Sequence, residues 1–153
     1  MTADGQLRQF IWDWPTRVFH WALVALVGGL WWTAENGVMD IHYLLGQCML
    51  GLLVFRIYWG FAGARSARFT DFIKWPGSVF SYARGLLRPD YAPASGHNPL
   101  GGLSVIAMLL VLVAQVTLGL FAVDVDGLES GPLSRHVDFD TGRAASDLHD
   151  TLF

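Results

Sequence analysis

Five histidines are the residues of this chain whose type and position suit them to chemistry: His20, His42, His97, His136 and His149. His20 lies near the start of one apolar run, His42 opens a second, and His149 lies close to the end of the sequence. An ionisable side chain in an apolar run is costly to bury, so it is a functional candidate by default. A lone histidine there is more often structural than a ligand. A ligand role is therefore favoured only where two histidines lie at the same depth.

His42 and His149 are expected at one depth, near the same end of the helices that carry them. Two neutral imidazoles on facing helices can bind the iron of a haem from both sides. Such a site has no open coordination position, so it transfers electrons instead of binding a substrate at the metal. Zinc would need two further ligands at that depth. Glu35, Asp40 and Asp147 would have to supply them from loops, which makes zinc the weaker alternative.

His20 is expected near the opposite end of the helices, where it would need another partner to ligate iron. His97 is the only other histidine at that level. It lies in the turn-like sequence Gly96-His97-Asn98-Pro99, which favours a loop role. His136 falls in an acidic loop, where a solvated side chain is expected.

Two arginines are candidates for contact with a haem propionate. Arg56 is the only charged residue of the second apolar run, and Arg17 lies next to His20 in the sequence. A guanidinium matches a carboxylate in bidentate geometry, although either side chain can instead snorkel to the interface. Contact with a propionate is the role that we favour for both.

Gly46 follows His42 by four residues and therefore lies on the same helical face. The missing side chain would let a flat macrocycle approach the backbone, but small residues also serve close packing of membrane helices. Cys48 is the single cysteine, which excludes an intramolecular disulfide, and no C-x-x-C-H motif is present for covalent haem attachment. Cys48 is expected to be a small buried apolar residue.

Apolar helices are expected to carry most of these residues. Hydrophobic residues make up 53% of the sequence and charged residues 15%, whereas a soluble domain carries about 25% charged residues. Three runs, at residues 18–34, 41–62 and 100–123, are long enough to cross most or all of a hydrocarbon core of about 30 Å. The sequence predicts an all-α transmembrane bundle in a single domain spanning residues 1–153, with lipid as its surroundings.

Two further helices are expected outside these runs. The segment between the second and third runs mixes basic and aromatic residues, which predicts a helix lying on the membrane surface. Residues from about 144 onward resemble the opening turns of a fourth helix that stops before an apolar run develops. Three spans of an expected four are therefore predicted.

The basic residues predict the orientation. Eight of the ten Lys and Arg residues fall in the N-terminal segment, in the loop between the second and third runs, or at Arg56 beside that loop. The positive-inside rule then places the N-terminus in the cytoplasm. No basic stretch alternates with aromatic residues on a polar face, so nucleic acid is not expected as a partner.

Several motifs together resemble the bacterial cytochrome b561 family, which is related to the b-type cytochrome subunits of nickel–iron hydrogenases. The opening motif runs from Trp12 to Trp21, and the second-helix motif is Ile41-His42-Tyr43-Leu44-Leu45-Gly46. The stretches 55–61, 63–72 and 96–102 are also similar to this group, and Leu148-His149 resembles the start of its fourth helix. The resemblance covers nearly the whole chain, in order.

The resemblance implies a four-helix bundle with two b haems in the bacterial inner membrane. It implies that His42 pairs with His149 on one haem. It also implies that His20 ligates the second haem, with a partner that would fall beyond Phe153. Family members pass electrons between membrane quinols and other redox proteins, and some anchor a larger enzyme.

Transmembrane electron transfer by non-covalent haem is therefore the expected function, with a quinone on one side. Two alternatives remain. One is a haem-poor membrane anchor, completed by a homodimer or by a separate fourth-helix chain. The other is a small transporter, which would want polar residues at the middle of its spans, where residues 107–113 are wholly apolar.

Overall fold

The computed structural model describes residues 13–64, 67–73, 75–85, 99–124 and 129–152. Within these ranges the chain is all-α and has no strand, which confirms the predicted fold class. The helices are α1 (Trp14–Glu35), α2 (Met39–Ala62), α3 (Phe69–Phe72), α4 (Pro76–Gly85), α5 (Pro99–Phe121) and α6 (Phe139–Leu152), with a short 3-10 turn, η2 (Ser134–His136).

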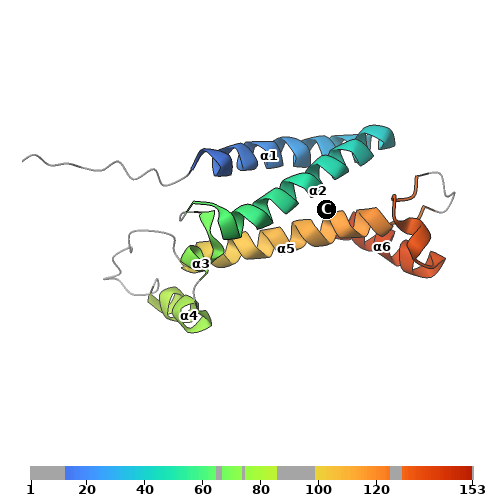
Figure 1. The fold of residues 1–153 in the computed structure, drawn as a ribbon. Coiled ribbons are helices and arrows are strands. Elements are labelled where there is room, and N and C mark those ends of the chain that lie inside the picture. Colours follow the sequence, from blue (N-terminus) through green and yellow to red (C-terminus); the bar gives the residue numbers. More distant parts are fainter. Residues whose placement is uncertain (1–12, 65–66, 74, 86–98, 125–128, 153) are drawn as a thin grey trace, which may run out of the picture.

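Three long helices form the body of the molecule (Figure 1). α1 packs against α2, and α2 packs against α5. The buried residues that join them are Phe19, Met49, Leu53 and Leu109. Many other large apolar side chains point outward, including Trp21 and Leu110. An apolar exterior of this extent is suited to lipid rather than to water.

α2 and α5 are long and apolar enough to cross a membrane. α1 has a similar length but is not apolar enough to count as such a span, because Trp, His and Gly residues dilute its aliphatic side chains. Its role as a further span stays a prediction. Cys48 is exposed on α2, so the expectation that it is buried was wrong; its side chain lies on the outward face and not in the core.

The segment between α2 and α5 contains the short α3 and the ten-residue α4. α4 contacts α5 and lies beside the main bundle (Figure 1). A helix in this segment was expected from the sequence, whereas its location on a membrane surface stays a prediction. His97 lies outside the described residues.

The connection from α5 to α6 turns the chain back on itself. The backbone N–H groups of Gly131 and Leu133 donate to the carbonyls of Ala122 and Leu120, at 2.8 and 2.9 Å. Carbonyl groups at the end of a helix lack partners within it, and these bonds satisfy two of them. α6 consequently folds back along the end of α5 (Figure 1).

α6 begins at Phe139, earlier than the expected start near residue 144. The reason is the preceding residue, Asp138. One carboxylate oxygen accepts the backbone N–H of Thr141 at 2.9 Å, and the other accepts the hydroxyl of Thr141 at 2.7 Å. An aspartate that accepts from the third residue of a helix is an N-cap. The carboxylate belongs to the helix and not to the acidic loop.

This cap predicts a pH dependence of α6. The hydrogen bonds from the backbone and side chain of Thr141 lower the pKa of Asp138 below its ordinary value of 3.8. A lowered pKa means that the stabilisation is complete above the ordinary value and is lost as the pH falls through the folded-state value. The protection of the first amides of α6 against exchange, measured relative to the intrinsic rate at each pH, should therefore fall only below about pH 4. Asp138→Ala should show low protection at every pH, and Asp140→Ala should behave like the parent. A parent profile that matches Asp138→Ala at neutral pH would contradict the cap.

Candidate functional site

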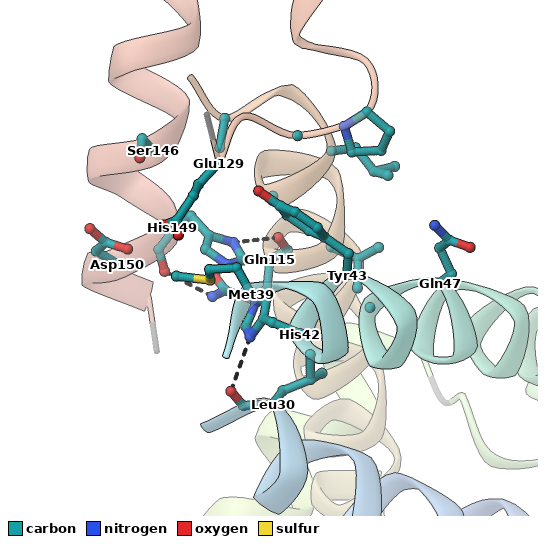
Figure 2. Close-up of a pocket in the computed structure, with 17 residues that line it drawn as sticks. Leu30, Met39, His42, Tyr43, Gln47, Gln115, Glu129, Ser146, His149 and Asp150 are labelled. Carbon is teal, nitrogen blue, oxygen red and sulfur yellow. Dashed lines mark hydrogen bonds between the residues drawn. The ribbon is translucent and has the colours of Figure 1, made fainter. Parts of the chain in front are cut away.

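A pocket of about 180 Å³ lies where α2, α5 and α6 meet (Figure 2). Its lining joins residues that are far apart in the sequence. Those that matter here are His42, Tyr43, Gly46, Gln115, Gly119 and His149.

His42 and His149 face each other across this pocket. The centroids of their rings are 6.3 Å apart, and the ring planes are nearly perpendicular, at 85°. His42 comes from α2 and His149 from α6, and the two residues are 107 positions apart in the sequence. The structure thus brings together the pair that was expected to share a depth.

His42 is held by α1. Its Nδ1 lies 3.1 Å from the carbonyl oxygen of Leu30 (Figure 2). The same nitrogen lies 3.2 Å from the hydroxyl of Thr33. A carbonyl oxygen can only accept a hydrogen bond, so the proton of the neutral ring is on Nδ1. The lone pair is then on Nε2, the nitrogen that is left to bind a metal.

His149 is held by α5 in the same manner. Its Nδ1 lies 2.9 Å from the carbonyl oxygen of Gln115, which again assigns the lone pair to Nε2. In return, the side-chain amide of Gln115 donates to the carbonyl of His149 at 2.8 Å. This reciprocal pair of bonds fixes both the imidazole and the backbone of α6.

The geometry matches one metal ion between two imidazoles. A metal–nitrogen distance of roughly 2 Å on each side, extended by the radius of each ring, puts the two centroids about 6 Å apart. A ligating histidine normally donates its other ring N–H to a carbonyl or carboxylate, and both rings do so here. Among the described residues, no group of three His, Cys, Asp or Glu side chains is arranged to hold a metal, as the zinc alternative would need.

Two glycines shape the pocket. A Cβ atom built at Gly46 would meet nothing within 4 Å, so this face of α2 opens onto the pocket. A Cβ at Gly119 would lie 2.9 Å from Cε1 of His149, so α5 approaches the imidazole closely only because a side chain is missing. Gly46 therefore has the space that a flat ligand requires, and its contact with haem stays a prediction.

Two buried polar atoms in the pocket have no hydrogen-bond partner within the described residues: the Tyr43 hydroxyl and the Gln115 amide oxygen. Buried polar atoms are nearly always paired, with protein, water or ligand. Carboxylates of Glu129 and Asp150 stand at the rim, where no described Lys or Arg joins them (Figure 2). A bound molecule would therefore keep its anionic groups away from this rim.

His20 lies at a second level. Its Nδ1 is 2.7 Å from the carbonyl oxygen of Thr16, so the same argument assigns the proton to Nδ1. Thirteen residues of α1 separate His20 from Thr33, which is about 20 Å along a helix. His20 is therefore remote from the pocket. Its candidate partner His97 lies outside the described residues.

The two arginines also lie away from the pocket. Arg56 is only 5% exposed, and its guanidinium donates to the carbonyl of Ala67 at 3.3 Å. It also stands over the rings of Phe69 and Phe19, at 5.2 and 5.9 Å from their centroids. Arg17 is exposed on α1. Neither side chain can contact a group held between His42 and His149, and propionate contact at the level of His20 stays a prediction for both.

Thr33 and Gln115 were not identified from the sequence. Thr33 lies near the end of the first apolar run and has no spacing that relates it to His42. Gln115 carried a usable signal, because it is the only amide side chain in a helix without charged residues, and polar residues inside such helices are functional candidates.

Apolar helices of membrane length, together with two facing imidazoles whose other nitrogens are hydrogen-bonded, define a membrane protein of the b-type cytochrome class. A family model described as prokaryotic cytochrome b561 matches residues 11–153, and the chain belongs to this family. No curated protein and no solved structure matches it significantly. The family identified from the sequence is confirmed. Membership implies transmembrane electron transfer by b haem.

Proposed function

We propose that this chain moves electrons across a membrane with a b haem whose iron is ligated by His42 and His149. The main support for the proposal is the facing pair of imidazoles, whose ring centroids are 6.3 Å apart. The Nδ1 proton of each ring is bonded to a carbonyl of a neighbouring helix. A bound b haem would supply one-electron chemistry at its iron.

The chain's own residues would orient and shield such a group. α1 fixes His42, α5 fixes His149, and Gly46 leaves the space between them open. Because both axial positions would be filled by protein, this site would exchange electrons and not bind substrate at the metal. We propose His20 as a ligand at a second level. Its partner would be a residue beyond Phe153, as the family resemblance implies, or His97, or a residue from another chain.

We further propose that the electrons are exchanged with a membrane quinone and a redox protein. The bias of the basic residues supports an N-terminus in the cytoplasm of a bacterium and the pocket near the outer face. α5 is the most apolar of the helices and offers a lipid-facing surface that a quinone can reach from the bilayer.

The test is reduction of the purified protein in liposomes by a short-chain quinol, followed by haem absorbance. We expect rapid reduction by quinol in the parent protein, and we expect the part of the absorbance change due to the haem between α2 and α6 to be absent in a variant that lacks His42. Reduction by dithionite but not by any quinol would reject the quinone and leave the haem site standing.

A further inference from the structure

Thr33 is one of the most deeply buried polar residues that the structure describes, with only 1% of its side chain exposed. Its hydroxyl oxygen lies 2.8 Å from the carbonyl of Gly29 and 3.0 Å from the carbonyl of Leu30. The same oxygen lies 3.2 Å from Nδ1 of His42. Thr33 thus joins the backbone of α1 to an imidazole on α2.

The direction of each bond follows from the donors present. The two carbonyls can only accept, so the hydroxyl proton of Thr33 is directed at one of them. The proton on Nδ1 of His42 then has two acceptors, the carbonyl of Leu30 and the lone pairs of the Thr33 hydroxyl. Among the described residues, the Nδ1 proton of His149 has one acceptor, the carbonyl of Gln115.

We infer that Thr33 is a positioning residue that sets the orientation and the basicity of His42, and through it the reduction potential of the bound haem. This inference rests on the proposed function, because it takes His42 to be an iron ligand. Accepting a hydrogen bond from the remote N–H of an imidazole makes the ligating nitrogen more basic. A more basic ligand favours ferric over ferrous iron, so the hydroxyl of Thr33 holds the potential down.

The burial of Thr33 strengthens its interaction with His42, because a hydrogen bond is electrostatically stronger in a low-dielectric interior than in solvent. Threonine hydroxyls in helices often bond back to the carbonyl four residues earlier without any further role. Thr117 does so on α5, where it is exposed and donates to Val113 at 2.7 Å. It provides a matched control.

The experiment is a redox titration of the haem in Thr33→Val, Thr33→Ser and Thr117→Val beside the parent. Valine keeps the shape of threonine and removes the hydroxyl. We expect Thr33→Val to raise the midpoint potential through a change of up to about tenfold in the ratio of ferric to ferrous binding, which is about 59 mV for one electron. Thr33→Ser and Thr117→Val should match the parent.

A second measurement keeps the inference testable whether or not the variant retains haem. Nitrogen-15 NMR of His42 in haem-free protein should show a weaker Nδ1–H hydrogen bond in Thr33→Val only. If Thr33→Val loses haem while Thr33→Ser keeps both haem and the parent potential, the hydroxyl is still the cause. Equal potentials and spectra in Thr33→Val and the parent, or the same change in Thr33→Ser, would overturn the inference. A parent protein that binds no haem would instead overturn the proposed function.

Discussion

Haem bound between α2 and α6 is expected to be lost when either His42 or His149 is replaced by alanine. In the proposed site each imidazole would supply one of the two axial bonds, so either replacement would remove half of the protein's ligation of the iron. Even the loss of an outer hydrogen-bond partner typically weakens metal binding about 10- to 100-fold, so removal of a ligand should cost at least as much. The pyridine haemochrome assay measures the result as haem per chain.

His136→Ala is the matched control. This histidine is exposed on η2 and does not line the pocket, so its replacement should leave the haem content unchanged. If the parent holds two haems, one equivalent should disappear in His42→Ala and His149→Ala. Parent-level haem in either variant would contradict the assignment of that residue as a ligand.

Gly46→Leu is expected to fold normally and to bind haem more weakly. Nothing lies within 4 Å of a Cβ built at this position, so the haem-free protein has room for a side chain. With haem present, the same side chain would occupy the space between α2 and the macrocycle. Overpacking costs about 1–3 kcal/mol, which corresponds to haem binding weakened roughly 5- to 150-fold.

Gly51→Leu provides the comparison on the same helix. Gly51 is exposed, its Cβ would also meet nothing within 4 Å, and it does not line the pocket. Without haem, both variants should unfold at the same temperature as the haem-free parent. Only Gly46→Leu should lose haem affinity. Equal haem affinity in the two variants would show that the open face of Gly46 is not where the ligand lies.

The long helices and the central pair of histidines were predictable because both depend on local signals. Long apolar runs with at most one charge predicted residues 41–62 and 100–123, and the structure has α2 at Met39–Ala62 and α5 at Pro99–Phe121. The shared depth of His42 and His149 followed from their positions at helix ends. The family resemblance supplied the same pair independently.

The contacts that orient the histidines were not predictable, because they cross between helices. Thr33 meets His42 only through the packing of α1 on α2, and Gln115 meets His149 only because the chain folds back after α5. The start of α6 was misplaced since Asp138 was counted with the acidic loop and not as a cap. The exposure of Cys48 depends on which face of α2 is covered, and the mostly apolar run around it does not mark that face.

The reduced-minus-oxidised absorption spectrum of the purified protein, combined with haem quantification, tests most directly whether the chain binds b haem. We expect a b-type spectrum with at least one haem per chain. The haem between α2 and α6 should be lost in His42→Ala and His149→Ala and kept in His136→Ala. The absence of any haem spectrum in protein reconstituted with excess haem in lipid would contradict the proposed function.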